Sequence, residues 1–153
     1  MRKGTLMGDA GALPRVDRLL VVVAHPDDES FGLGALLTSF IARGTTVSVL
    51  CFTRGENSTL RTHGPDLGSI RCEELHAASH VLRVNSVELL SYPDGGLADV
   101  ALGDLRDEVL RRASDADGLL VFDEGGVTGH PDHCRATRAA IAAADTLDLP
   151  VLA

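Results

Sequence analysis

The sequence predicts a doubly wound α/β domain, with a mostly parallel sheet and helices on both faces. Short apolar runs of strand length alternate with segments whose apolar residues recur at helical spacing, and this alternation is typical of βαβ units. Aromatic residues make up only 3% of the chain, so we expect a core of Val, Leu, Ile and Ala, which suits a parallel sheet covered by helices. The predicted strands lie near residues 19–24, 46–52, 86–90, 118–122 and 150–153.

The helices between these strands follow from apolar residues spaced three or four positions apart. The first set is Phe31, Ala35, Leu36, Phe40 and Ile41. Gly44 stands where this first helix would end, and two further helices are expected around residues 70–82 and 102–110. Right-handed crossovers between parallel strands favour the order 3-2-1-4-5, which makes the first and fourth strands neighbours where the order reverses.

Length and composition predict one domain in the cytoplasm. With 153 residues, of which 44% are hydrophobic, the chain fits a single core, and we expect a flexible tail at 1–17 before a domain at 18–153. Polar residues, glycine and proline interrupt any signal-like apolar segment in that tail, and no run approaches the roughly 20 apolar residues of a membrane helix. Three cysteines without a CxxC pair are typical of reduced thiols.

The charge of the chain argues against a nucleic-acid partner. The formal net charge is -8, and the chain lacks the clustered Lys and Arg that neutralise phosphates. It also lacks a set of aromatic residues on which bases could stack. A small-molecule substrate is therefore favoured over a nucleic acid or a membrane.

Two short polar strings each follow a predicted strand, and they carry the chemistry. HPDDE occupies residues 25–29 after the first strand, and HPDH occupies residues 130–133 after the fourth. In an open α/β sheet, ligands bind outside the carboxyl ends of the strands where the strand order reverses. We therefore expect the two strings to face each other, with residues 53–68 and 91–99 at the rim of the same site.

The side chains of the two strings suit a catalytic metal centre. His25 and Asp28, three apart in the expected first turn of a helix, can bind one metal ion together with His133 from the opposing loop. Three protein ligands and an open position are typical of catalytic zinc, whereas structural zinc has four ligands. Asp27 then stays free as the general base for the metal-bound water, and His130 is placed to stabilise the oxyanion.

Two further acidic residues are expected to support this centre rather than to bind the metal. Asp132 is a candidate partner that fixes the tautomer of a histidine. For Glu29 a structural role is preferred, either a bond back to the loop or a favourable charge at the helix N-terminus. A single HxxD at a helix start is also explained by a capping aspartate and a structural histidine. The metal hypothesis therefore depends on the pair of strings.

Together, the two strings resemble those of a known family. AHPDDE at 24–29 with GHPDH at 129–133 is similar to the LmbE-like, or PIG-L, metal-dependent deacetylases, and the similarity continues through residues 53–56, 71–75 and 92–97. The resemblance implies a Rossmann-like fold and zinc-dependent removal of an N-acetyl group, commonly from a glucosamine unit of a larger glycoside or thiol conjugate. Zinc is the implied cofactor, with Fe²⁺ as the alternative in the cell.

By motif position, the resemblance also implies His25, Asp28 and His133 as metal ligands, Asp27 as the general base and His130 as the oxyanion stabiliser. It adds two residues that would contact the substrate. Arg71 and Asp94 are implied to contact sugar hydroxyls, although an ordinary ion pair and a turn aspartate would also explain them. Some members carry tyrosine two places before the first histidine of the second motif, where this chain has Thr128. A tyrosine hydroxyl from this loop therefore cannot assist the reaction.

The chain stops at residues 150–153, just as the fifth strand begins, whereas members of the family usually continue. We therefore expect the C-terminal part of the family fold to be missing, which would expose a sheet edge and apolar helix faces. Low solubility or association into a homo-oligomer is the expected consequence.

Two other functions remain open from the residues alone. A truncated metal-binding domain without activity would bind zinc and hydrolyse no acetamide. A non-haem iron oxygenase also uses two histidines and one carboxylate, although its triad normally needs no further carboxylate such as Asp27. The leading hypothesis is a zinc-dependent deacetylase that acts on a small N-acylated sugar or conjugate.

Overall fold

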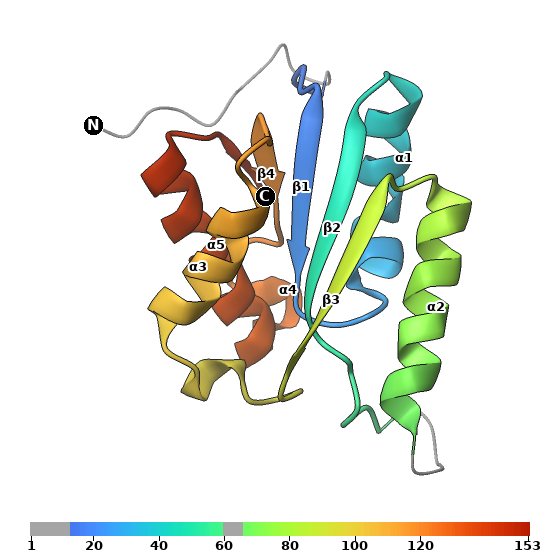
Figure 1. Ribbon diagram of the computed structural model, residues 1–153, viewed down its shortest axis with the longest axis vertical. Helices are drawn as coiled ribbons and strands as arrows, with labels where there is room; N and C mark the ends of the chain where they lie inside the picture. The colour runs from blue at the N-terminus through green and yellow to red at the C-terminus, as the bar shows by residue number, and fades with distance from the viewer. Residues whose placement is uncertain (1–12, 60–65) are drawn as a thin grey trace.

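The computed structural model describes residues 13–59 and 66–153 and shows a five-stranded parallel sheet (Figure 1). The strands lie in the order β3-β2-β1-β4-β5, as the alternation of strands and helices predicted. Their bounds are β1 Arg18–Val23, β2 Thr46–Thr53, β3 Ser86–Tyr92, β4 Gly118–Leu120 and β5 Val151–Leu152. Because β1 pairs with both β2 and β4, the strand order reverses at β1.

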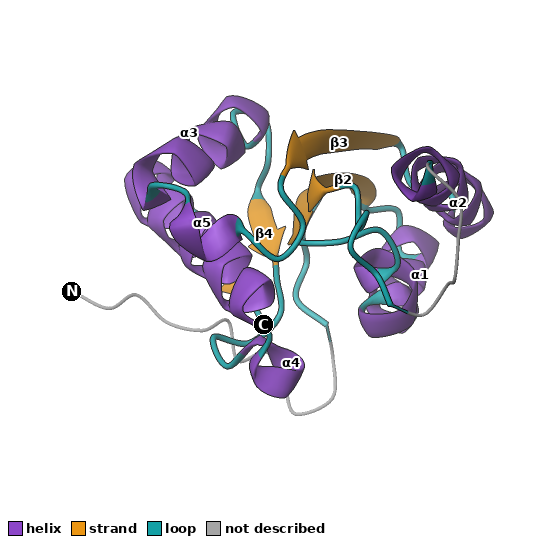
Figure 2. Ribbon diagram, turned by 90° about the horizontal axis from the view of Figure 1, so that it is seen from below, coloured by secondary structure: helices purple, strands orange, loops and turns teal. Residues whose placement is uncertain are grey.

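In the part of the chain that the structure describes, two long helices cover each face of the sheet (Figure 2). One face carries α1 Gly34–Ala42 and α2 Leu67–Leu82, and the other carries α3 Leu102–Arg112 and α5 Pro131–Leu147. Shorter turns follow three of the strands, namely a π-helical turn at Asp28–Gly32, a 3-10 turn at Leu97–Asp99 and α4 at Gly126–Gly129. The predicted α/β class is confirmed.

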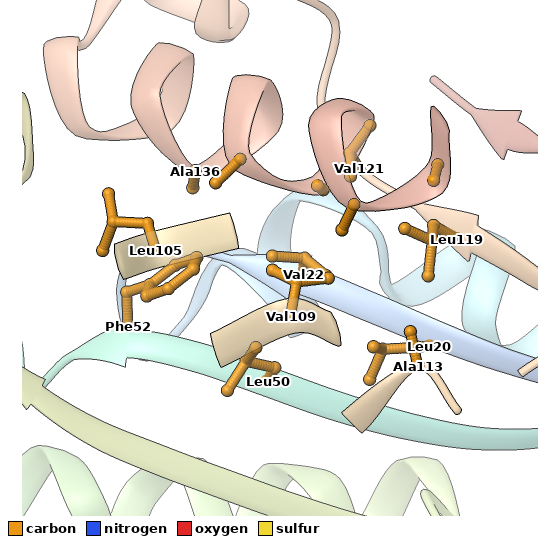
Figure 3. Close-up of a cluster of buried hydrophobic side chains, with 14 of the residues drawn as sticks. Leu20, Val22, Leu50, Phe52, Leu105, Val109, Ala113, Leu119, Val121 and Ala136 are labelled. Atoms are coloured by element: carbon orange, nitrogen blue, oxygen red, sulfur yellow. The ribbon is translucent and has the colours of Figure 1, made fainter. Parts of the chain in front are cut away.

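The side chains of β1 alternate between two apolar cores, one on each face of the sheet. Leu20 and Val22 pack with the residues of α3 and α5 (Figure 3), while Leu19 and Val21 pack with those of α1 and α2. On α5, the apolar residues of the buried face are Ala136, Ala139, Ala140, Ala143 and Ala144. Burial on both faces fixes β1 at the centre of the sheet, and the loop that follows it is thereby placed beside the loop after β4.

Two local expectations are corrected by the structure. Residues 1–12 of the expected tail lie outside the described residues, but Val16 is 7% exposed and packs in the core. The carbonyl oxygen of Val16 also accepts a hydrogen bond from Thr45 Oγ1 at 2.7 Å, so the folded domain begins before residue 18. The expected apolar set of the first helix is only partly buried: Phe40 is buried, but Leu36 in α1 is exposed, and Phe31, which lies in a π-helical turn before α1, is 91% exposed.

Three further expectations concern membrane-spanning helices, the cysteine thiols and the edges of the sheet. Within residues 13–59 and 66–153, no helix is long and apolar enough to cross a membrane. Cys51, Cys72 and Cys134 are free. Strands β3 and β5 are the two outer strands of the sheet in the described part of the chain, and the exposed edge expected from a missing C-terminal part stays a prediction. Self-association through such an edge stays a prediction.

Candidate metal centre

The two polar strings meet at the carboxyl ends of β1 and β4, which are neighbours in the sheet. His25 Nδ1 lies 3.2 Å from His133 Nε2, although 108 positions separate the two residues in the sequence. Asp28 Oδ1 lies 3.2 Å from the same nitrogen of His133, and Asp28 Oδ2 lies 3.7 Å from His25 Nδ1. The structure thus brings together the three residues that the sequence predicts as metal ligands.

These separations fit a tetrahedral metal centre. Ligand atoms at about 2.0 to 2.1 Å from a zinc ion stand about 3.3 Å apart along the edges of a tetrahedron. The distances of 3.2, 3.2 and 3.7 Å between the three side chains are close to that value. Their exposed fractions are between 9% and 14%, so the donors are largely withdrawn from water.

Each ligand histidine has one ring nitrogen that points toward the other ligands and one that points away from them. The hydrogen bonds of the nitrogens that point away determine which nitrogen carries the proton. His25 Nε2 lies 3.1 Å from Asp132 Oδ2 and 3.1 Å from Asp94 Oδ1, and His133 Nδ1 lies 3.1 Å from the carbonyl oxygen of Gly126. Because all these oxygens accept, the protons belong on the outer nitrogens, and the lone pairs of the inner nitrogens face each other. Facing lone pairs beside a carboxylate repel one another unless a cation lies between them, so the donor set fits a metal ion.

Asp28 and His133 each favour the charged form of the other. Burial alone would raise the pKa of Asp28, but the hydrogen bonds and charges of His133 and His25 together hold this pKa below its usual range. Burial alone would lower the pKa of His133, but its hydrogen bond to Asp28 and the charge of that carboxylate raise it. A proton and a metal ion therefore compete for His133, as is general for histidine ligands.

The backbone around residue 27 separates the two aspartates of the first string. Asp27 has a φ of 106°, which non-glycine residues rarely adopt. The Asp28 carboxylate folds back onto the strand end, where Oδ2 accepts hydrogen bonds from the N–H of Ala24 at 3.2 Å and of His25 at 2.9 Å. The expectation that His25 and Asp28 share the first turn of a helix is wrong, because a π-helical turn begins at Asp28 and His25 precedes it.

Asp27 lies outside the group of ligands and pairs with Arg71. Arg71 Nη2 lies 2.8 Å from Asp27 Oδ2, and the same nitrogen donates to the carbonyl oxygen of Pro26. The Asp27 side chain is 43% exposed, whereas that of Arg71 is 11% exposed. The arginine implied to contact a sugar therefore borders the expected general base, and its contact with a substrate stays a prediction.

Asp94 is held in the site by the loop that follows β2. The backbone N–H of Asn57 donates to Asp94 Oδ2 at 2.8 Å, and Asn57 Nδ2 donates to the Asp94 carbonyl oxygen at 2.6 Å. The Asp94 N–H in turn donates to Glu56 Oε1 at 3.0 Å. Sequence reasoning missed Glu56 and Asn57, although the irregular stretch that contains them follows a strand beside β3 and was therefore expected at the rim.

The two supporting acidic residues are fully buried. Asp132 accepts hydrogen bonds from the backbone N–H of Gly95 at 2.8 Å and of Leu97 at 3.0 Å, in addition to its contact with the first ligand histidine. Glu29 Oε2 accepts a hydrogen bond from the N–H of Asp27 at 2.9 Å, and burial raises the pKa of this carboxyl group. Both carboxyl groups thus tie neighbouring backbone to the site.

His130 is the N-cap residue of α5, and it differs from the two ligand histidines in its tautomer. Its Nδ1 accepts a hydrogen bond from the Asp132 N–H at 3.2 Å, which places the ring proton on Nε2. A ring nitrogen of each of His25, His130 and His133 lies within 4.8 Å of the others, so proximity alone would also allow a three-histidine centre. His130 has no free lone pair in this arrangement and suits hydrogen-bond donation better than metal binding.

A cleft of about 490 Å³ opens onto the residues that were expected to act on a substrate or a metal. Its lining includes His25, Asp27, Asp28, Arg71, Asp94, His130 and His133. Asp132 and Glu29, which were expected to play supporting roles, do not line it. The arrangement therefore combines ligand donors, a separate carboxylate and a separate N–H donor around one cavity.

Two comparisons with known sequences agree with this geometry. The family model of PIG-L, described as GlcNAc-PI de-N-acetylase, matches residues 20–144. A 1D-myo-inositol 2-acetamido-2-deoxy-alpha-D-glucopyranoside deacetylase from Geodermatophilus obscurus is 32% identical over 155 residues, which cover 84% of this chain and 53% of that protein. The chain spans about half the length of the curated relatives that it matches.

Solved structures share the fold. The N,N'-diacetylchitobiose deacetylase from Pyrococcus horikoshii, in complex with an inhibitor, has a TM-score of 0.74 at 26% identity, covering 85% of this chain and 50% of that one. A conserved protein from Thermus thermophilus has a TM-score of 0.70 at 31% identity, covering 91% of this chain and 61% of that one. The likeness thus extends over most of the present chain, but over only 50% and 61% of these two larger ones.

Proposed function

Because the chain belongs to the PIG-L family, we propose that it hydrolyses the amide of an N-acetylated, or similarly N-acylated, glucosamine-type substrate with the help of a bound metal ion. One observation carries this proposal. The side chains of the two strings separate into three converging donors and two groups that border the same cleft, Asp27 and His130. A purely structural metal site has no use for these two additional groups.

His25, Asp28 and His133 would hold the metal, and zinc is the ion that we expect, with Fe²⁺ as an alternative occupant. Such an ion acidifies water and polarises an acyl carbonyl. The acceptors behind the two histidines, Asp132 and the Gly126 carbonyl, keep both inner lone pairs available for binding.

Asp27 acts as the general base and then as the general acid. Its carboxylate takes a proton from water as the water oxygen bonds to the acyl carbon, and it returns the proton to the nitrogen as the C–N bond breaks. Acetate and the free amine are the products. Arg71 holds Oδ2 of this carboxylate at 2.8 Å, so the orientation of the base is set before the substrate arrives.

His130 stabilises the negative charge that develops on the acyl oxygen. Because Nδ1 accepts from the Asp132 N–H, the proton on Nε2 is available for donation to that oxygen. Arg71 and Asp94 border the same cleft and supply a donor and an acceptor for hydroxyl groups of the sugar. This pair and the family support the substrate class, and two imidazoles with one carboxylate support zinc as the metal.

Metal analysis combined with acetate release tests the proposal. Zinc per chain and acetate released from N-acetylglucosamine and its methyl glycoside are measured for the wild type, Asp27→Asn and His133→Ala. We expect Asp27→Asn to keep its zinc and to lose about 10²- to 10⁴-fold in rate, because only the proton acceptor is removed. His133→Ala should lose both zinc and activity.

Asp145→Asn is the matched control, since Asp145 is exposed on α5 and does not line the cleft. The mechanism is wrong if Asp27→Asn hydrolyses the substrates as fast as the wild type. If the wild type binds one zinc ion and releases acetate from none of these acetamides, the chain is the inactive metal-binding domain instead.

A further inference from the structure

The π-helical turn after β1 presents an aromatic side chain to solvent beside the cleft. Phe31 is 91% exposed, the largest fraction among the large exposed hydrophobic side chains of the described residues. The next residue, Gly32, packs so closely on the core that an added Cβ would lie 2.5 Å from the ring of Phe122. Because residue 32 is held against the core, the neighbouring Phe31 is directed outward.

Phe31 borders a second cavity, of about 300 Å³, between this turn and α2. Its apolar lining includes Phe31, Leu75 and Ala78, and Arg71 and Glu74 add charge. The cavity shares Asp27, Ser58 and Arg71 with the catalytic cleft, so the two cavities adjoin at the ion pair between Asp27 and Arg71. We refer to this second cavity as the Phe31 pocket.

We propose that the Phe31 pocket binds the aglycone of the substrate, and that it selects aglycones with a ring that offers an apolar face. This inference rests on the proposed function, in which Arg71 contacts the sugar. A substituent that extends from the sugar past Arg71 enters the Phe31 pocket. Neither His130 nor His133 lines this pocket, so an acyl group held beside those residues lies on the other side of the sugar.

The lining suits a ring that carries polar groups at its edge. An aromatic side chain offers a flat apolar surface, and a second ring placed against it removes apolar area of both partners from water. The guanidinium of Arg71 and the carboxylate of Glu74 stand at the same pocket and can bind hydroxyl groups at the edge of the ring. A methyl aglycone is too small to cover Phe31.

The test compares phenyl and methyl glycosides of N-acetyl-β-D-glucosamine as substrates. We expect Phe31→Ala to lower kcat/KM for the phenyl glycoside by about tenfold, mainly through KM, because about 1.4 kcal/mol of ring contact is lost. The methyl glycoside should change by less than about twofold. Ala78→Phe fills the same pocket from α2 and should likewise reduce the reaction of the phenyl glycoside selectively.

Val81→Ala is the matched control, because Val81 is 79% exposed on α2 and lines neither cavity. The proposal is overturned if the wild type shows no preference for the phenyl glycoside, or if Phe31→Ala lowers the reaction of both glycosides equally. It is also overturned if Phe31→Ala alters the preference between acetyl and butanoyl amides of one glycoside, since the pocket would then hold the acyl group.

Calorimetry with phenyl and methyl β-D-glucosaminide, which contain no amide, separates this proposal from the proposed function. Tighter binding of the phenyl compound to the zinc-loaded wild type, lost in Phe31→Ala, supports the pocket even if no acetate is ever released. Equal binding of both compounds to the wild type, together with normal deacetylation, removes the pocket and leaves the enzymatic function in place.

Discussion

The loops after β1 and β4 hold their metal ligands in different ways. In the first loop, the carboxylate of Asp28 accepts hydrogen bonds from backbone N–H groups within residues 24–29, whereas the ring of His25 is oriented by Asp94 and Asp132 from outside that loop. In the second loop, the orientation of His133 depends on the carbonyl oxygen of Gly126, seven residues earlier and outside the HPDH string. The carboxylate ligand is therefore held from within its own motif, whereas both histidine ligands are oriented from outside theirs.

The second loop also carries more unusual backbone geometry. Gly126, Val127 and Gly129 have φ values of 68°, 64° and 77°, whereas Asp27 alone has a positive φ in the first. The carboxylate of Asp123 stabilises the second loop, because its oxygens accept the N–H of Gly125 at 2.8 Å and of Val127 at 3.2 Å. A match to the second motif thus says less about the geometry of its ligand histidine than a match to the first says about the geometry of its ligand aspartate.

Among the variants that test this comparison of the two loops, Gly126→Ala should cause the largest loss of stability and of zinc affinity. The new Cβ would lie 2.8 Å from Cys134 Sγ and 3.1 Å from the Cys134 nitrogen, at a φ that strains alanine. The loop must shift, and the acceptor behind His133 is lost. We expect about 2 to 4 kcal/mol less stability and about 10- to 100-fold weaker zinc binding, measured by denaturant unfolding and by competition with a chelator.

Gly129→Ala is the control for this prediction. Gly129 also has a positive φ, but nothing lies within 4 Å of its added Cβ. This variant should lose only about 1 kcal/mol and keep its zinc affinity. Equal zinc affinity in both variants would show that the Gly126 carbonyl does not position His133.

A smaller effect is expected in the first loop from Glu29→Gln. Burial raises the pKa of Glu29, and its Oε1 has no hydrogen-bond partner among residues 13–59 and 66–153. A carboxyl group with a raised pKa in the folded state contributes stability at low pH that is lost as the pH rises above its unfolded value of about 4.3. The variant keeps an acceptor for the Asp27 N–H but does not ionise.

Glu29→Gln should therefore gain stability relative to the wild type between pH 4 and pH 7, by up to about 1 kcal/mol as judged by denaturant unfolding. Glu124→Gln, at an exposed position in the second loop, should show no such trend. A constant difference between Glu29→Gln and the wild type over this pH range would mean that burial does not penalise the charge of Glu29.

The sequence was sufficient to predict the features that depend on periodicity. Alternating strands and helices gave the strand order, and the order placed His25 beside His133. Features that depend on local irregularities of the backbone or on contacts between loops could not be predicted. The outward position of Phe31 depends on a π-helical turn, which the spacing of apolar residues does not reveal. The hydrogen bond from the Asn57 N–H to Asp94 joins two loops that are far apart in the sequence, so it is known only once the structure is known.

The smallest effect in the comparison should come from Val127→Gly in the second loop. Val127 has φ 64° and ψ -56°, a conformation that is strained for a β-branched residue, and its side chain is 62% exposed. Glycine relieves this strain at little cost in packing, and the relief exceeds the added entropy of the unfolded chain. We expect a gain of about 0.5 to 1 kcal/mol in denaturant unfolding with unchanged zinc affinity. Lower stability would mean that Val127 makes a contact that outweighs its backbone strain. The two loops would then still differ in how they hold their metal ligands, but not in the free energy stored as backbone strain.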